Sequence, residues 1–313
     1  MELSGVLNIN KSEGMTSHDV VDVVRRFLKI RRVGHTGTLD PRATGVLPVC
    51  VGRATRIAQF LTQADKEYLI TMRLGITTDT LDADGKVLSQ TDDISVDPVK
   101  LREILNGFVG EIQQVPPLFS AKKHRGERLY RLARRGETVK REPVTVKIYD
   151  LTFLSIDLPF IRIRVSCSKG TYARALCDDI GRELGCGAHL FALTRTRSGR
   201  FLVEEAIILD QLRKVVEEGR ILEVLIPVGE ALDHLPAVRV HPESSRSVVQ
   251  GSGTVAASLI SFPSGVEKGD LVRVLGYRRR LLSLAEATVA GREFAGTDPR
   301  RVVLKPVRVL AGQ

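Results

Sequence analysis

Residues 34–49 constrain this chain more than any other segment of it. They read G-H-T-G-T-L-D-P-R-A-T-G-V-L-P-V and place one carboxylate, Asp40, in a loop rich in Gly, Thr and Pro. Gly34 and Gly37 permit positive φ and a close approach to the backbone, and Pro41 disfavours a helix at Asp40. A carboxylate held in this way is a candidate nucleophile. An ordinary turn has a similar composition, so the interpretation depends on the rest of the chain.

The overall charge indicates a polyanionic partner. The chain has 313 residues, enough for about two domains, and carries a formal net charge of +10 with a pI near 9.7. A basic excess of this size favours nucleic acid as the partner.

The sequence predicts a cytoplasmic protein without a membrane segment. No apolar run reaches the roughly 20 residues that cross a bilayer, and the N-terminus lacks the layout of a signal peptide. The cysteines form no C-x-x-C pair, so we expect reduced thiols and no zinc site. They are Cys50, Cys167, Cys177 and Cys186.

Helical signals recur along the first two thirds of the chain. Thr16 and Asp19 form a capping pattern before an apolar periodicity, and Asp97-Pro98 starts another. Two further helices are predicted, over residues 54–64 and from about Thr171 to Leu184. The first helix ends in a basic run that we expect both to complement the helix dipole and to hold phosphates beside the Asp40 loop.

Alternating apolar and polar residues predict strands over 68–74, 144–148 and 161–167. Such strands, with one polar face, indicate an α+β fold with a mixed, mostly antiparallel sheet flanked by helices. Beyond about residue 236 short β-like runs alternate with Gly-rich turns. We therefore expect a catalytic domain over 1–236 and a small β-rich domain over 237–313.

Four further segments give the Asp40 loop a context. They are Lys66-Glu67-Tyr68, the run from Pro116 to Gly136, Ser168 to Arg174, and Leu193 to Phe201. Together with the loop, they resemble the TruB-type tRNA pseudouridine synthases, in order along nearly the whole N-terminal domain. The part after residue 236 resembles the PUA domain that follows in this family, through weaker motifs.

The resemblance implies an isomerase with the pseudouridine synthase fold. Its substrate would be uridine 55 in the T-loop of tRNA, whose N1–C1′ bond breaks before the uracil rejoins through C5. The family uses neither a metal nor a cofactor, and none is expected here. The chain lacks the long basic C-terminal extension of relatives that work with guide RNA. We therefore expect a stand-alone, monomeric enzyme that binds the tRNA T-arm.

The resemblance assigns three catalytic residues. Asp40 takes the position of the nucleophile, and Arg174 that of its arginine partner. Burial would raise the pKa of Asp40, and we expect the guanidinium to reverse this shift. The N-terminal end of a helix is an unfavourable place for a cation, so an arginine there indicates a specific partner. Tyr68 matches the tyrosine that stacks on the uracil and serves in proton removal from C5, although strand packing alone would also account for it.

Four other residues are matched to the family's site with weaker support. Tyr172 and Leu193 would line the uracil pocket, although each would otherwise be assigned to the core. Arg56 would lie near the site, and a simple place on a helix surface fits it equally well. An RNA base must be extruded to reach such a pocket. His35 is a candidate either to occupy the vacated space or to contact the flipped nucleotide, and we expect it to assist RNA binding rather than proton transfer.

A strongly basic segment spans residues 122–141. Its cations greatly outnumber its acids, which are Glu127 and Glu137. A solvated helix face is the simplest interpretation of a charge run, but so unequal a balance favours binding to RNA phosphates. Lys122, Lys123 and Arg128 are the RNA-binding candidates in this segment.

Two other functions were weighed against an RNA isomerase. A non-catalytic RNA-binding protein needs only the basic surface, and the complete Asp40 motif argues against it. An aspartyl-phosphate transferase needs a second acid two residues after the nucleophile, where Arg42 stands. The acids at Asp79, Asp82 and Asp84 are similar to those of a calcium loop, but Thr80 stands where the first ligand belongs and Thr91 replaces the closing glutamate. We therefore expect a hairpin or an active-site edge here.

Overall fold

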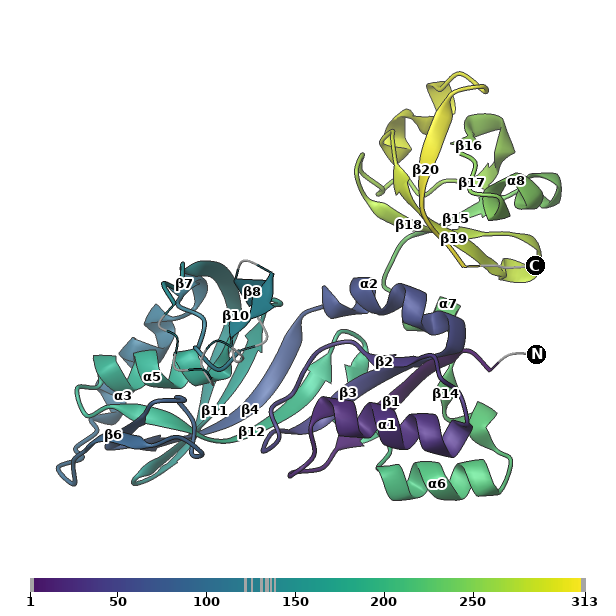
Figure 1. Cartoon of the computed structure of the whole chain (residues 1–313). Helices are drawn as coiled ribbons and strands as arrows, with labels where there is room; N and C mark the ends of the chain where they lie inside the picture. Colours follow the sequence, from purple (N-terminus) through teal and green to yellow (C-terminus); the bar gives the residue numbers. More distant parts are fainter. Residues whose placement is uncertain are drawn as a thin grey trace.

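The computed structural model describes residues 3–120, 123–124, 126–129, 132, 135, 137 and 139–310. Within them a larger unit is built on a ten-stranded sheet and a smaller one on a six-stranded sheet (Figure 1). No helix in the described part of the chain is long and apolar enough to span a membrane.

The ten-stranded sheet carries the site at its centre. Its main path runs β14-β1-β3-β12-β4-β11-β10-β7, with β2 and β13 paired at its side. All of its pairings are antiparallel except that of β12 with β3. The strands are β1 (Gly5–Lys11), β2 (Val33–His35), β3 (Thr44–Val51), β4 (Lys66–Leu74), β7 (Gly110–Gln114), β10 (Val144–Asp157), β11 (Phe160–Cys167), β12 (Ala188–Ser198), β13 (Phe201–Leu202) and β14 (Leu225–Ile226). The predicted mostly antiparallel sheet is confirmed.

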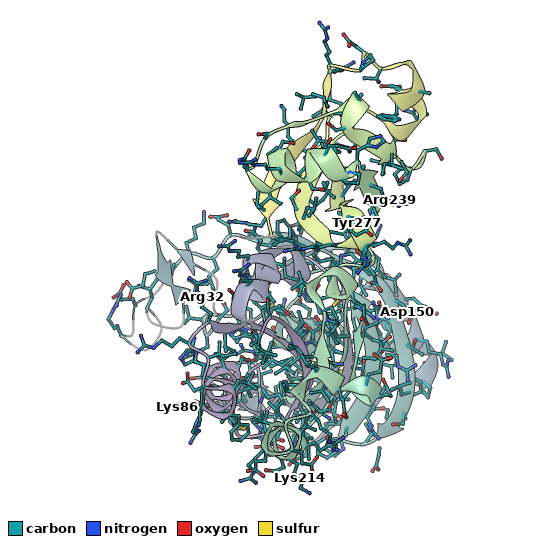
Figure 2. All side chains as sticks on the ribbon, turned by 90° about the vertical axis from the view of Figure 1, so that its right-hand side faces the viewer. Arg32, Lys86, Asp150, Lys214, Arg239 and Tyr277 are labelled. Atoms are coloured by element: carbon teal, nitrogen blue, oxygen red, sulfur yellow. The ribbon has the colours of Figure 1, made fainter. Side chains whose placement is uncertain are left out.

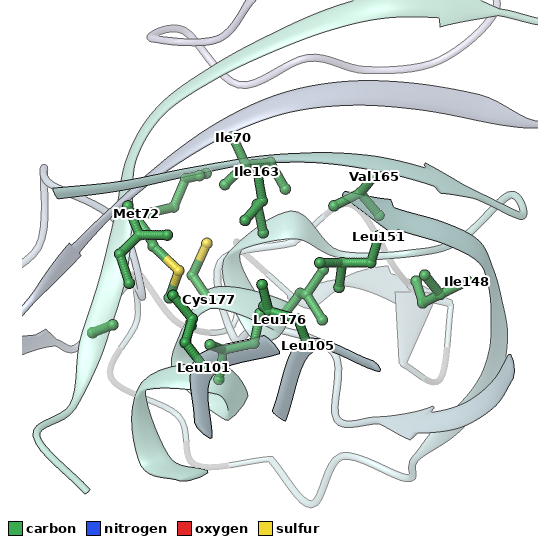
Figure 3. Close-up of a cluster of buried hydrophobic side chains, with 14 of the residues drawn as sticks. Ile70, Met72, Leu101, Leu105, Ile148, Leu151, Ile163, Val165, Leu176 and Cys177 are labelled. Atoms are coloured by element: carbon green, nitrogen blue, oxygen red, sulfur yellow. The ribbon is translucent and has the colours of Figure 1, made fainter. Parts of the chain in front are cut away.

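Helices cover the large sheet in two groups (Figure 1). Helices α3 (Pro98–Gly107) and α5 (Ala173–Glu183) pack beside β10 and β11, whereas α1 (Ser17–Leu28) and α6 (Leu209–Glu217) lie beside β1 and β3. Figure 3 shows the hydrophobic core between the sheet and the helices α3 and α5, in which Met72 of β4 lies near Leu101 of α3 and Cys177 of α5. Alternation along β11 turns Ile163 and Val165 into this core and leaves Arg162 and Arg164 exposed.

The predicted capping signals are confirmed, whereas two helix boundaries differ. The Thr16 side chain and the Asp19 side chain form a reciprocal capping box on α1, and Asp97 caps α3. The predicted helix over 54–64 is a 3₁₀ helix, η1 (Gly52–Ile57), followed by the short helix α2 (Ala58–Thr62). Helix α5 begins at Ala173 rather than near Thr171, because Tyr172 keeps an extended backbone as its N-cap.

The smaller sheet follows the order β16-β20-β19-β18-β15-β17. Its strands are β15 (Ala237–Val240), β16 (Thr254–Val255), β17 (Leu259–Ser261), β18 (Leu271–Leu275), β19 (Leu281–Ala287) and β20 (Val302–Val309), with helix α8 (Ser245–Val249) packed against them. Leu284 of β19 is fully buried and belongs to the same hydrophobic cluster as Val6 and Leu232 of the larger unit. The two units therefore share apolar packing next to the short helix α7 (Val228–Ala231).

Two small hairpins complete the described elements. Strands β5 (Ile76–Thr78) and β6 (Val87–Gln90) enclose the acidic loop of residues 79–86, and β8 (Lys123–His124) pairs with β9 (Glu127–Arg128). The hairpin predicted from the acid spacing is thus present. The remaining 3₁₀ helices are η2 (Val203–Glu205), η3 (Ile221–Glu223), η4 (Pro242–Ser244), η5 (Ala256–Ser258), η6 (Tyr277–Arg279) and η7 (Gly291–Gly296).

Candidate active site

A cavity of about 440 Å³ opens between the Asp40 loop, strands β4 and β12, and the segment that leads into α5. Its size falls within the usual range of small-molecule pockets. The catalytic residues predicted from the sequence, Asp40, Tyr68 and Arg174, all line it. They come from the loop before β3, from β4 and from the start of α5, so the fold brings together residues that are far apart in sequence.

The loop that carries Asp40 is held on both sides by polar contacts from α1 and β1. The Ser17 hydroxyl accepts a hydrogen bond from the Leu39 amide at 2.8 Å and donates one to the Leu39 carbonyl at 3.1 Å. The buried Lys11 ammonium donates to the carbonyls of Pro41 and Met15, at 3.0 and 2.7 Å. These contacts fix the backbone immediately before and after Asp40.

Arg174 makes the ion pair that the sequence predicted. Its Nη2 lies 3.1 Å from Asp40 Oδ2, and its Nη1 lies 3.3 Å from Asp82 Oδ2. The Phe119 carbonyl accepts a further bond from Nη2 at 2.9 Å. The arginine side chain is 9% exposed, whereas that of Asp40 is 44% exposed. The guanidinium is therefore fixed within the protein, and the carboxylate it contacts is open to the cavity.

The pKa of Asp40 is raised despite this ion pair. Burial is the largest cause, Arg174 opposes it, and the neighbouring Asp82 adds to the increase. The expectation that the guanidinium would reverse the effect of burial is therefore wrong. Arg174 divides its charge between two carboxylates, so it offsets only part of the desolvation of Asp40.

Tyr68 lies on the cavity wall, opposite Arg195 in the register of β4 and β12. Burial raises the pKa of its phenol, and the positive charge of the Arg195 guanidinium opposes that rise. A tyrosine base needs a neighbour that lowers its pKa, and Arg195 is such a neighbour. Its effect on the pKa of Tyr68 is smaller than the opposing effect of burial.

The other residues singled out from the sequence fall into three groups. Tyr172 and Leu193 line the cavity, as the resemblance implied. His35 on β2 and Arg56 on η1 are outside the cavity lining, and the His35 ring accepts a bond from the Gly37 amide at 3.3 Å. Lys122 lies outside the described residues, and for Lys123 and Arg128 only the backbone of the β8–β9 hairpin is described.

A second cavity of about 400 Å³ meets the first at the Asp40–Arg174 pair. Its far wall comes from the acidic loop between β5 and β6, including Asp82 and Asp84, and from Phe191 of β12. Arg42 bridges the two sides through an ion pair with Asp84 at 2.8 Å. The acidic loop is therefore an active-site edge, the second of the two alternatives that the sequence left open for it.

Sequence reasoning missed four residues that organise the site. Asp82 carried a signal, because it belonged to an acidic loop already singled out, and Arg195 lay inside a quoted motif. Lys11 and Ser17 carried no signal, since their roles depend on the packing of β1 and α1 against the Asp40 loop. Within the described residues no group of three His, Cys, Asp or Glu side chains could hold a metal ion.

Gly45, at the start of β3, is a position where the backbone requires glycine. Its φ is +97°, and an added Cβ would lie 2.2 Å from the carbonyl oxygen of Arg195. We expect Gly45→Ala to destabilise the protein by at least about 2 kcal/mol, which corresponds to a fall in Tm of roughly 5 °C. Gly34→Ala is the matched control, because its Cβ would meet nothing within 4 Å. Equal Tm values for the two variants in thermal melts would contradict this assignment.

Known proteins resemble this chain along most of its length. The model of the TruB family pseudouridylate synthase N-terminal domain matches residues 25–173, and that of the tRNA pseudouridylate synthase B C-terminal domain matches 174–233. A tRNA pseudouridine synthase B from Geotalea uraniireducens is 44% identical, with 92% of this chain and 93% of the relative covered. One from Pelotomaculum thermopropionicum is 40% identical, with 99% and 98% covered.

Solved structures agree in fold. A chain from the crystal structure of a Cbf5-Nop10-Gar1 complex has a TM-score of 0.80 and 31% identity, with 98% of this chain and 85% of that chain covered. A chain from an H/ACA RNP bound to a substrate RNA containing 2′-deoxyuridine gives 0.79 and 29%, with 98% and 85% covered. With the two matching family models and relatives of at least 40% identity, these findings show that the chain belongs to the TruB family of pseudouridylate synthases.

Proposed function

We propose that this chain is a tRNA pseudouridine synthase that converts uridine 55 in the T-loop of tRNA to pseudouridine. The observation that carries the proposal is the half-buried Asp40 carboxylate, held 3.1 Å from the buried Arg174 guanidinium on the wall of a cavity that Tyr68 also lines. The relatives named tRNA pseudouridine synthase B support tRNA as the substrate.

Asp40 would act as the nucleophile. The N1–C1′ bond breaks, the uracil turns within the cavity, and C5 bonds to C1′ while its proton leaves and N1 gains one. Three routes are compatible with this role: attack by Asp40 at the ribose C1′, attack at the uracil C6, and formation of a glycal. Attack at either carbon requires the ionised carboxylate, and Arg174 favours that form.

Tyr68 would stack on the uracil and accept the proton from C5 after the base has turned. Leu193, which lines the same cavity, would pack beside the ring. The uridine must leave its stack before it can enter, at a cost of a few kcal/mol. His35 lies outside the cavity wall, where it would contact RNA during this extrusion rather than transfer a proton.

We further propose that the enzyme acts in the cytoplasm as a monomer without a guide RNA. The curated relatives named tRNA pseudouridine synthase B, which match up to 99% of this chain, support a stand-alone enzyme. The six-stranded domain would act as the PUA-like domain and contact the acceptor end of the tRNA. Its junction with the larger unit carries Tyr277 and Arg239 (Figure 2).

The direct test uses unmodified tRNA transcripts and the purified full chain. We expect one pseudouridine per tRNA, located in the T-loop, and none when uridine 55 is replaced by cytidine. The rival function, RNA binding without catalysis, would give a stable complex and no pseudouridine at any position. That outcome would refute the proposed activity.

Binding to tRNA should weaken steeply with salt, because it releases counterions from the phosphates. The exposed Arg31 and Arg32 follow the basic end of α1. Replacing both with glutamine should reduce the slope of log K against log[salt] by roughly one for each lost contact. Lys214→Gln is the control, since Lys214 lies on α6 at the opposite end of the molecule from the smaller domain (Figure 2). A flat response for the wild type would exclude an electrostatic clamp.

The rate should also depend on the ionisation of Asp40. Its pKa is raised above the ordinary value of 3.8, so the nucleophile becomes protonated at a higher pH than a normal aspartate. We expect the acid limb of kcat/KM to lie above pH 3.8, with tRNA binding measured in parallel to separate loss of binding from loss of chemistry. An acid limb at or below that value would show that Arg174 outweighs burial.

A further inference from the structure

Arg195 occupies an unusual place in the large sheet. Strand β12 lies between β3 and β4, and Arg195 is in register with Tyr68 on one side and with Gly45 on the other. Its side chain therefore stands between the strand that follows the Asp40 loop and the strand that carries the tyrosine.

The contacts of Arg195 join these two parts of the site. Its Nε donates to the Val46 carbonyl at 2.7 Å, and its Nη2 donates to the Gly37 carbonyl at 3.2 Å. Arg195 and Tyr68 are cross-strand partners on β12 and β4, and both line the same cavity. The residue is only 2% exposed, and no carboxylate among the described residues lies within ion-pair distance of it.

A buried cation without a carboxylate partner is costly. The two carbonyl acceptors do not explain why this residue is charged, because a neutral amide side chain could donate hydrogen bonds to both. The phenol is different, because it is the one neighbour that gains negative charge when it loses its proton. The charge of Arg195 is therefore best matched to the anionic form of Tyr68.

We propose that Arg195 is a positioning residue that faces Tyr68 across the two strands and stabilises its anionic form, while it anchors the Gly37 carbonyl three residues before Asp40. One side chain thereby holds Tyr68 and the loop that carries Asp40 in fixed positions relative to each other. In the reaction the Tyr68 phenolate takes the proton from C5 and becomes a phenol, which later releases that proton to solvent. No oxidant or co-reactant is needed.

The charges around Tyr68 support this assignment. Arg195 is the group that lowers the pKa of Tyr68, whereas burial, Cys167 on β11 and Asp40 raise it. In turn, burial lowers the pKa of Arg195 and Tyr68 raises it. Removal of the guanidinium would leave the phenol with only those effects that disfavour its ionisation.

The test begins with a titration of tyrosinate absorbance in the RNA-free protein. The chain has five tyrosines and no tryptophan, so the difference between wild type and Tyr68→Phe isolates Tyr68. We expect Arg195→Met to move its ionisation upward by at least about one pH unit, a tenfold change in the anionic fraction. Arg195→Lys keeps a charge and should show a smaller shift. Arg197→Met is the matched control, because Arg197 lies on the same strand and bonds Ser166 of β11.

Single-turnover rates give the second readout. We expect Arg195→Met to lower the rate about 100-fold with unchanged tRNA affinity, to move the basic limb of the pH profile upward, and to be partly rescued by Arg195→Lys. In the Tyr68→Phe background, Arg195→Met should lower the single-turnover rate little further, because Arg195 acts through the Tyr68 phenol. An unchanged Tyr68 titration, or fully additive losses, would overturn the proposal.

The inference rests on the proposed function only for the role of Tyr68 as the base. The titration needs no substrate, so a failed shift refutes the Arg195–Tyr68 coupling even when pseudouridine forms normally. Conversely, absent product together with the expected shift would refute the activity and leave the coupling intact. If Arg195→Met lowers Tm so far that the protein is unfolded during the titration, the milder Arg195→Lys variant is titrated instead.

Discussion

Replacement of Asp40 with asparagine is expected to abolish pseudouridine formation, with a loss of at least about 10⁴-fold in the single-turnover rate. A nucleophile that is removed cannot be replaced by binding or by neighbouring groups, and losses of this size are typical. The affinity for tRNA should stay close to wild type, because an amide of the same shape keeps the cavity wall. Rates and affinities are measured on the same unmodified transcript.

The stability of the Asp40→Asn variant is a useful control. The pKa of Asp40 is raised above its unfolded value, so the native state binds that proton more tightly than the unfolded chain does. Ionisation at neutral pH therefore opposes folding, and removal of the charge should not lower Tm. Asp210→Asn, on an exposed position of α6 where it pairs with Arg213, should leave rate, affinity and Tm unchanged. Residual turnover by Asp40→Asn within tenfold of wild type would rule out a nucleophilic role.

Replacement of Arg174 should produce the second largest effect. The variant Arg174→Met leaves Asp40 and Asp82 without their shared cation, and breaking such a pair costs about 3–5 kcal/mol. If most of that cost appears as loss of ionised Asp40, the rate should fall about 100- to 1,000-fold. The acid limb of the pH profile should also move to higher pH, which shows that the defect concerns ionisation.

Arg174→Lys separates charge from geometry. The arginine contacts two carboxylates and two carbonyls through a planar fork, and a lysine cannot reproduce that arrangement. We expect the lysine variant to restore part of the pH profile and little of the rate. Equal rates for the lysine, methionine and wild-type proteins would show that the ion pair is a structural contact only.

The sequence predicted those parts of the fold that depend on local pattern. Thr16 with Asp19, and Asp97 with Pro98, define helix starts through contacts made within one turn, so both were found correctly. The helix over 54–64 was predicted from its apolar residues, but the backbone begins there as a 3₁₀ turn. Patterns of side chains do not distinguish the two kinds of helix when the segment is short.

The site was predictable only where its residues lie inside distinctive motifs. Asp40, Tyr68 and Arg174 were named from the sequence, and they line one cavity. Lys11 was not named, because a lysine is ordinarily expected on the surface, and only the tertiary structure places its ammonium group beside the Pro41 carbonyl. Its pKa is lowered to about 8 by burial, opposed by Asp40, and both effects depend on the tertiary structure.

The most direct test of the account is the release of the C5 hydrogen from tRNA that carries tritium at C5 of its uridines, under single-turnover conditions. Formation of the C5–C1′ bond requires that hydrogen to leave, so its release reports the isomerisation itself. The account predicts one equivalent per tRNA with the wild type, none with Asp40→Asn, and none from the wild type when uridine 55 is replaced. Tritium release by Asp40→Asn at the wild-type rate would contradict it.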